Sequence, residues 1–159
     1  MSTEDPRVLY VPAGGGASRW VFGDRYTFKA DAKDTGGAFS LLEAVVPADA
    51  GPPPHIHHHA DEAFYVLDGA IEFTDGEEKH VVERGGFVFV PRGSVHGFRN
   101  LGPDPVKMLG WFTPGGTEGF FQELGVPAVA GEPAPPDPQR LTDAEDALKI
   151  LTKYHSQYL

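Results

Sequence analysis

The sequence Pro53-Pro54-His55-Ile56-His57-His58-His59-Ala60-Asp61-Glu62 opens the stretch, up to residue 100, that decides the fold of this chain. The runs around it are short and rich in β-branched and aromatic residues, which predicts β-strands. Alternate residues of a strand point to the same face, so His55 and His57 face one side together. If His96 reaches the same interior, three imidazoles converge with the carboxylate of Glu62. Such a set of nitrogen and oxygen ligands suits a divalent first-row transition metal.

Two blocks of regularly spaced residues carry these candidate ligands. The first block contains His55, His57, Glu62 and Gly69. The second block contains Gly85, Pro91, Gly93, His96 and Asn100. Pro91 restricts φ and Gly93 permits a positive φ just before His96, so the spacing predicts a turn that aims this histidine.

These blocks resemble the two conserved motifs of the cupin superfamily, a small β-barrel that holds one metal ion between them. The second block matches that pattern at every fixed position, whereas Gly51 lies two residues closer to the first histidine than the pattern expects. Segments 36–40, 52–55, 61–67 and 119–125 further resemble single-domain, quercetinase-like (quercetin 2,3-dioxygenase-like) bacterial cupins. The resemblance runs from about Val8 to the C-terminus and is looser in the tail.

The resemblance implies that His55, His57, Glu62 and His96 hold one divalent ion (Mn, Fe, Co, Ni or Cu, or Zn if the chemistry is redox-neutral). Glu62 would also act as the catalytic base. The implied reaction is the dioxygenation of a flavonol or a similar aromatic enol or hydroxy-ketone with O2. Two alternatives stay open: a redox-neutral metal-dependent cupin, such as an isomerase, cyclase, lyase or decarboxylase, and a non-catalytic small-molecule-binding cupin.

Other histidines offer a competing register. His59 has the parity of His57, so a shifted site of His57, His59 and Glu62 is geometrically possible, but it leaves fewer residues before Glu62 than the family pattern has. His58 points to the opposite face and is expected at the surface. His80 and His155 have no companions, so we expect surface or structural roles for both.

The alternation of side chains along the strands also predicts which residues line a substrate pocket. Side chains that share the direction of Glu62 or His96 face the same interior. On the strand 106–112, one face carries Leu109 and Trp111, and we expect the other face to point inward. The predicted substrate-binding residues are Phe64, Val66, Phe98, Met108 and Phe112. Such a cavity suits a small, apolar and aromatic substrate with one polar anchor at the metal.

The chain is predicted to be all-β, a cupin jelly-roll barrel with a C-terminal α-helical tail, because short strands alternate with Gly, Pro and Asp clusters. Asp68-Gly69 and Asp75-Gly76 read as hairpin turns. The expected strands are Val8–Val11, Trp20–Phe22, Tyr26–Ala30, Ala38–Val46, Ala63–Leu67, Ala70–Thr74, Lys79–Glu83, Phe87–Val90, Gly97–Asn100 and Val106–Phe112. The expected organisation is a barrel over 1–125, a Pro/Ala-rich linker over 126–138, and a tail over 139–159. Within that tail, the helical pattern of 142–158 is expected to pack on the barrel or on a partner.

The amino-acid composition limits the number of domains, the kinds of site and the kinds of partner. The 159 residues suit a single domain, and the absence of cysteine excludes disulfides and thiolate metal sites. The formal net charge of −10 disfavours nucleic acid and anionic membranes as partners. There is no apolar run of membrane-spanning length and no signal-peptide pattern, so we expect a cytoplasmic protein. The resemblance implies a homodimer.

Overall fold

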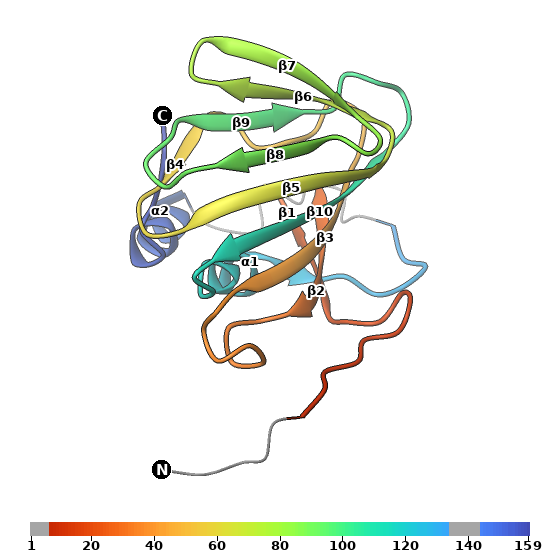
Figure 1. Cartoon of the computed structure of the whole chain (residues 1–159), viewed down its shortest axis with the longest axis vertical. Coiled ribbons are helices and arrows are strands. Elements are labelled where there is room, and N and C mark those ends of the chain that lie inside the picture. The colour runs from red at the N-terminus through yellow and green to blue at the C-terminus, as the bar shows by residue number, and fades with distance from the viewer. Residues whose placement is uncertain (1–6, 134–143) are drawn as a thin grey trace.

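The computed structural model describes residues 7–133 and 144–159, which form two antiparallel β-sheets and two short helices (Figure 1). The strands are β1 (Ser18–Val21), β2 (Asp24–Ala30), β3 (Ser40–Val46), β4 (His55–His57), β5 (Asp61–Asp68), β6 (Ala70–Asp75), β7 (Glu78–Glu83), β8 (Phe87–Val90), β9 (His96–Arg99), β10 (Val106–Thr113), β11 (Val126–Pro127) and β12 (Ser156–Tyr158). The helices are α1 (Glu118–Leu124) and α2 (Ala144–Lys153). Neither helix is long and apolar enough to cross a membrane.

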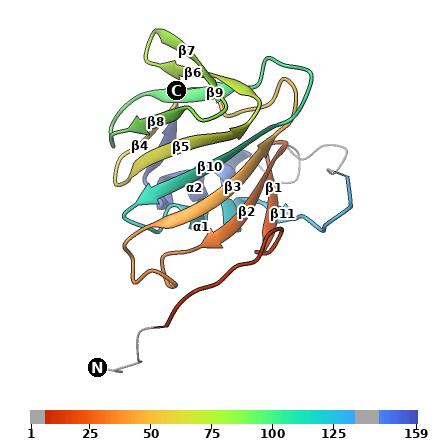
Figure 2. The ribbon, with the colours of Figure 1, turned by 45° about the vertical axis from the view of Figure 1, so that its right-hand side comes forward.

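The two sheets face each other as the halves of a jelly roll. The larger has the strand order β11-β1-β2-β3-β10-β5-β8, and the smaller has the order β12-β4-β9-β6-β7. Figures 1 and 2 show β4, β9, β6 and β7 on one side, and β10, β3 and β2 on the other. Helix α1 packs on β1 and on α2, and α2 packs on β12. The predicted all-β jelly roll with a helical tail is therefore confirmed.

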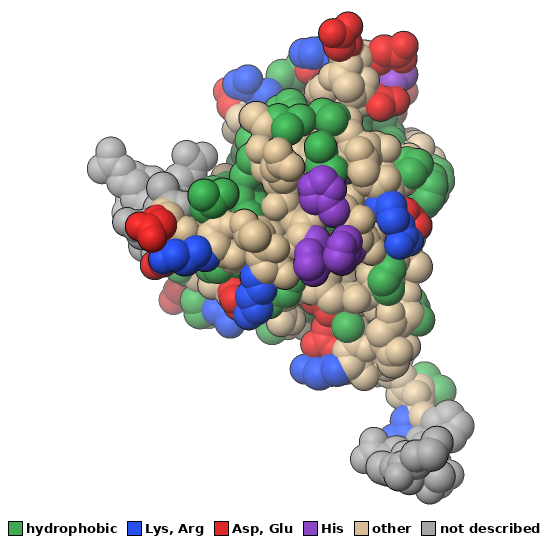
Figure 3. Space-filling model, turned by 90° about the vertical axis from the view of Figure 1, so that its left-hand side faces the viewer, with side chains coloured by type: hydrophobic (Ala, Val, Ile, Leu, Met, Phe, Trp, Pro, Cys, Tyr) green, Lys and Arg blue, Asp and Glu red, His purple; other side chains and the backbone are tan. Residues whose placement is uncertain are grey.

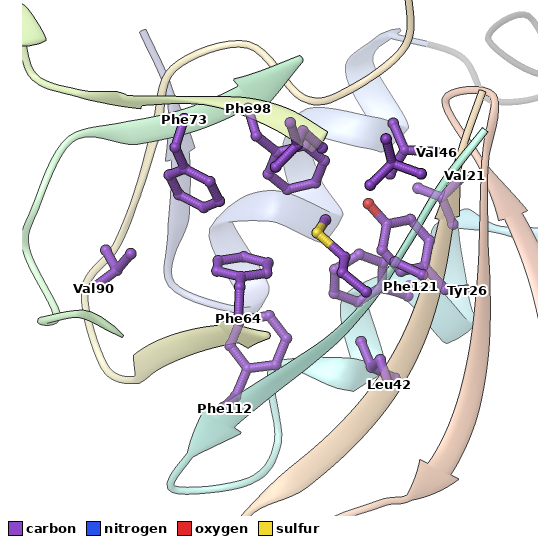
Figure 4. Packing of buried hydrophobic residues seen from close by; sticks show 14 of the residues in the cluster. Val21, Tyr26, Leu42, Val46, Phe64, Phe73, Val90, Phe98, Phe112 and Phe121 are labelled. Carbon is purple, nitrogen blue, oxygen red and sulfur yellow. The ribbon is translucent and has the colours of Figure 1, made fainter. Parts of the chain in front are cut away.

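The core lies between the sheets and follows the alternation of the strands. Along β10 the buried positions are every second residue from Val106 to Phe112, which is the face expected to point inward. Phe64 of β5 points toward Phe73 and Phe98 of the opposite sheet, with ring centroids 4.9 and 5.6 Å away (Figure 4). Burying one such phenylalanine contributes about 1.5–3 kcal/mol, so these contacts hold the sheets together.

Some local predictions were wrong. Residues 8–11 form no strand, because none of the strands in the described residues pairs with them, and Val8 and Tyr10 are exposed. Asp68-Gly69 is not a hairpin turn, since it connects β5 to β6, which lie in different sheets. The second turn does close a hairpin: Asp75 pairs with Glu78 and Gly76 has φ +56°.

The tail also differs from its prediction. Helix α2 ends at Lys153, and Ser156–Tyr158 form β12 on the edge of the smaller sheet, beside β4. Helix α1 was not anticipated. Of the predicted linker, residues 126–127 pair with β1 as β11, whereas residues 134–138 lie outside the described residues.

Candidate metal centre

Four buried side chains converge between the sheets: His55 and His57 from β4, Glu62 from β5 and His96 from β9. One ligand atom of each lies within 4.8 Å of the others, and each residue is at most 8% exposed. Oε2 of Glu62 lies 2.8 Å from Nε2 of His96 and 3.3 Å from Nε2 of His57. The structure thus brings together the four residues that the sequence singled out.

Strand pairing and one turn position these ligands. His55 pairs directly with His96 across β4 and β9, which places the two histidine motifs side by side. Before His96, the N–H of Ser94 donates to the carbonyl of Pro91 (3.1 Å) and closes a turn in which Gly93 has φ +85°. The N–H of Gly93 then donates to the carbonyl of His57 (2.8 Å). The predicted role of this turn has a direct structural basis, since the turn is bonded to the strand of the first motif.

Arg92 in the same turn is bonded to the residue that precedes Glu62. Its Nε and Nη2 donate to the two carboxylate oxygens of Asp61, each over 3.0 Å, and its backbone N–H donates to Oδ1 of Asp61 (2.9 Å). These hydrogen bonds lower the pKa of Asp61 to about 2. A bidentate pair of this kind adds directional specificity to charge attraction, so it ties the second motif to β5.

Hydrogen bonds to Nδ1 orient all three imidazoles. Nδ1 of His55 lies 2.9 Å from the carbonyl of Pro53, and Nδ1 of His96 lies 3.1 Å from that of Ser94. A carbonyl oxygen only accepts, so Nδ1 carries a proton in both rings and Nε2 faces the cluster, where a metal would take the place of any proton that Nε2 holds.

The third imidazole is oriented by the C-terminal strand. Nδ1 of His57 lies 2.8 Å from Oγ of Ser156 in β12. This hydroxyl donates to the carbonyl of Tyr154 (3.3 Å), so it accepts from His57. Ser156 stands 99 residues from His57 in the sequence, and no motif there pointed to it.

Burial and the contacts among the cluster residues shift their pKa values. Burial, followed by the charges of His96 and His57, lowers the pKa of His55 to about 3, which keeps this ring neutral. Burial raises the pKa of Glu62, but the charges and hydrogen bonds of His57 and His96 outweigh it and lower that pKa to about 2. Burial lowers the pKa of His96, and its hydrogen bond to Glu62 more than offsets this, so the net direction is upward. A carboxylate amid buried imidazoles is the donor chemistry of a divalent transition-metal site, and these residues fit one.

Comparison with known proteins agrees with this geometry. Residues 42–112 match the family model described as "Cupin domain", and this range contains all four cluster residues. The chain belongs to the cupin superfamily.

Two relatives of this cupin indicate how far the likeness extends. Quercetin 2,3-dioxygenase of Bacillus subtilis (strain 168) is 35% identical over 139 residues, which cover 86% of this chain and 40% of that protein. Germin-like protein 5-1 of Oryza sativa subsp. japonica is 34% identical over 108 residues, which cover 61% of this chain and 47% of that protein. This cupin therefore spans less than half of the length of either relative.

Two solved structures share its fold. The cupin domain of Schizosaccharomyces pombe Cnp3 has a TM-score of 0.59 at 20% identity and covers 68% of this chain and 75% of its own. The polyketide cyclase RemF from Streptomyces resistomycificus has a TM-score of 0.52 at 26% identity and covers 62% of this chain and 67% of its own.

A pocket of this cupin opens beside the cluster, and His55, His57 and Glu62 form part of its wall. Of the predicted substrate-binding residues, Phe64, Phe98 and Phe112 line it. Val66 and Met108 do not. They stand opposite each other on β5 and β10, farther along these strands from Glu62, and are buried in the core. The further lining residues include Val21, Phe22, Asp24, Tyr26, Leu42, Phe120, Phe121, Leu151, Ser156 and Tyr158, which sequence reasoning missed.

The remaining singled-out residues lie outside the cluster. His59 is exposed and stacks on His155 with ring centroids 3.7 Å apart, and histidine side chains gather on this face (Figure 3). The shifted register with His59 as a ligand is therefore absent. His58 and His80 are exposed as well. Asn100 is buried and donates to the carbonyls of Val46 and Asp104, so it holds the loop after β9.

Proposed function

We propose that this cupin is a metal-dependent dioxygenase of the quercetinase type, which cleaves a flavonol or a similar aromatic enol or hydroxy-ketone with O2. The observation that carries the proposal is that the His55, His57 and Glu62 side chains form a polar part of a pocket whose wall is mostly apolar and rich in phenylalanine. A planar aromatic substrate matches such walls, and its oxygens match such a polar end. The 35% identity to a quercetin 2,3-dioxygenase supports the same reaction class.

Each cluster residue then has a definite task. The three imidazoles and Glu62 would hold one divalent ion, which supplies Lewis-acid and redox chemistry when bound. Glu62 is ionised at neutral pH, so its carboxylate can accept the proton of an enol hydroxyl. The acceptors at Pro53, Ser94 and Ser156 keep the imidazoles aimed at the centre, and the phenylalanines orient the substrate and exclude water.

The pocket is narrow as it stands. The volume of the cavity is only about 40 Å³. Drug-sized ligands occupy pockets of about 300–1,000 Å³, so a flavonol enters only if part of the wall moves. Leu151 of α2 and Tyr158 of β12 belong to that wall. Both come from the C-terminal segment, whose β12 pairs with β4 and whose α2 packs on α1, so we propose that these two side chains turn aside on substrate binding while the backbone of the segment stays in place.

A redox-neutral reaction is the second candidate. The similarity to the polyketide cyclase RemF, at 26% identity, favours it, because the same four ligands could polarise an enolate without consuming oxygen.

Oxygen uptake separates the two candidates. Apoprotein is reloaded separately with Mn, Fe, Co, Ni or Cu, and uptake is recorded with quercetin against free-metal controls. The proposal predicts uptake with at least one metal, its loss in His96→Ala, and its collapse in Glu62→Gln with the fold retained. Turnover without oxygen uptake would favour the redox-neutral reaction. Uptake that survives Glu62→Gln near the wild-type rate would refute the role of Glu62 as base.

A further inference from the structure

A second buried carboxylate lies in the wall of the same pocket. Asp24, the first residue of β2, is 2% exposed, and its Oδ2 accepts a hydrogen bond from the hydroxyl of Tyr26 (3.1 Å). Its Oδ1 is buried and has no hydrogen-bond partner in the part of the chain that the structure describes. An unpaired buried carboxylate oxygen costs free energy, so its persistence here calls for a ligand group that pairs with it.

The hairpin that carries Asp24 is tightly specified. Asp24 pairs with Val21 across a two-residue turn in which Phe22 has φ +49° and Gly23 has φ +94°. Positive φ at both turn residues matches the twist of the flanking strands. Asp24 and Tyr26 then lie on the buried face of β2, so the local structure holds the carboxylate inward.

Asp24 is not one of the candidate metal ligands, but it lines the same pocket as three of them. It is absent from the group of mutually close ligand atoms, and yet it lines the cavity that His55, His57 and Glu62 also line. The same wall also carries apolar side chains, among them Leu42, Phe64 and Phe112. Burial raises the pKa of Tyr158, and the charges of Asp24 and Glu62 raise it further, so both carboxylates act on one hydroxyl in this cavity.

We propose that Asp24 is a second polar anchor for the substrate, and that its Oδ1 binds a hydroxyl group at the end of an aromatic substrate away from the metal ligands. The inference rests on the proposed function for the metal-binding end of that substrate. It deepens that function by naming the class of substrate. The substrate is a planar aromatic hydroxy-ketone that carries a further ring hydroxyl besides the chelating pair of oxygens.

The chemistry of a hydroxyl suits this carboxyl in either protonation state. Burial raises the pKa of Asp24 to about 7, against the hydrogen bond from Tyr26, which lowers it. Near neutral pH the group is therefore an acceptor in part of the molecules and a donor in the rest. A hydroxyl both donates and accepts, so it pairs with either form, whereas a bare carbonyl pairs only with the protonated form.

The test compares two probes that share the chelating 3-hydroxy-4-ketone. Quercetin carries further ring hydroxyls, and 3-hydroxyflavone carries none. Dissociation constants are measured by fluorescence quenching without oxygen, on metal-loaded protein and on metal-free protein. Asp24→Ala is the test variant, and Asp68→Ala, an exposed aspartate on β5, is the matched control. Circular dichroism and metal content are recorded for each.

Wild type and Asp68→Ala are expected to bind quercetin at least about 10-fold more tightly than 3-hydroxyflavone, as one charged hydrogen bond allows. In Asp24→Ala the ratio of the two dissociation constants should approach 1, because the variant binds quercetin more weakly. Its affinity for 3-hydroxyflavone and its metal content should stay unchanged. If Asp24→Ala does not fold, Asp24→Leu, which fills a similar volume and offers the substrate no hydrogen-bonding group, is judged by whether the same ratio falls.

The proposal that Asp24 anchors the substrate would be overturned if the folded Asp24 variant kept the wild-type ratio of dissociation constants. It would also be overturned if the variant lost the same affinity for both probes. Absence of quercetin binding to wild type would overturn it too. Failure of the dioxygenase proposal is distinguishable, because it appears as missing oxygen uptake while the binding ratio still depends on Asp24.

Discussion

Replacing Asp24 by Asn should make the protein more stable at alkaline pH and leave its stability nearly unchanged at pH 4. The ordinary pKa of an aspartate is 3.8, and burial raises that of Asp24 to about 7 in the folded protein. Between these two values the folded state binds more protons than the unfolded state, so the free energy of unfolding falls as the pH rises. The loss slows as the pH passes about 7, where half of the folded molecules have lost the proton of Asp24, and it is complete about one pH unit higher.

The size of the effect follows from the two pKa values. Their difference, at about 1.4 kcal/mol per pH unit, gives an upper limit of about 4 kcal/mol between pH 4 and pH 8. This is a large share of the 5–15 kcal/mol that is typical of a domain. Asn has the same shape, cannot ionise and still offers an oxygen to Tyr26. The stability difference at pH 4 should therefore stay within about 1 kcal/mol.

The assay is urea denaturation of metal-free protein, followed by circular dichroism at each pH unit from 4 to 8. The quantity of interest is the difference in the free energy of unfolding between Asp24→Asn and wild type. Contributions from Glu62 and the histidines are common to both proteins and cancel. The hydroxyls of Tyr26 and Tyr158, whose pKa values are raised by burial and by the charge of Asp24, stay neutral in this range. Asp68→Asn, an exposed control, should give a flat difference. A flat difference for Asp24→Asn as well would refute the reasoning from burial.

Three further outcomes are expected. His57→Ala and His96→Ala should each lose most bound metal by mass spectrometry, and unchanged metal content in both would contradict the assigned centre. Ser156→Ala removes the acceptor at Nδ1 of His57, so metal affinity in chelator competition should drop by about 10–100-fold, whereas Gln157→Ala, exposed on the same strand, should not change it. If the two variants bind metal equally, Ser156 does not orient His57. Light scattering at micromolar concentration should give twice the 17.2 kDa of one chain, since we expect a homodimer, and a monomeric mass would argue against it.

Short-range physics explains what could be predicted of the fold. The signals that predict strands act over a few residues: alternation of apolar and polar side chains, β-branched residues, and Gly or Pro between the strands. Every expected strand from Trp20 to Phe112 therefore matches an observed one to within two residues at each end. The same alternation identified the buried face of β10. Pairing between distant strands does not follow from such signals, and Asp68-Gly69 therefore looked like a hairpin although it joins two sheets.

The sequence by itself determined the metal-ligand candidates, because His55, His57, Glu62 and His96 belong to two spaced motifs whose parity and turns are local properties. Only the tertiary structure decided what surrounds them. Asp24 enters the pocket through a hairpin with no recognisable site motif, and Ser156 reaches His57 from 99 residues away. The physical reason is that pocket walls and hydrogen-bond partners depend on how the sheets curve and which edges meet. Those contacts are set by the packing of the whole chain.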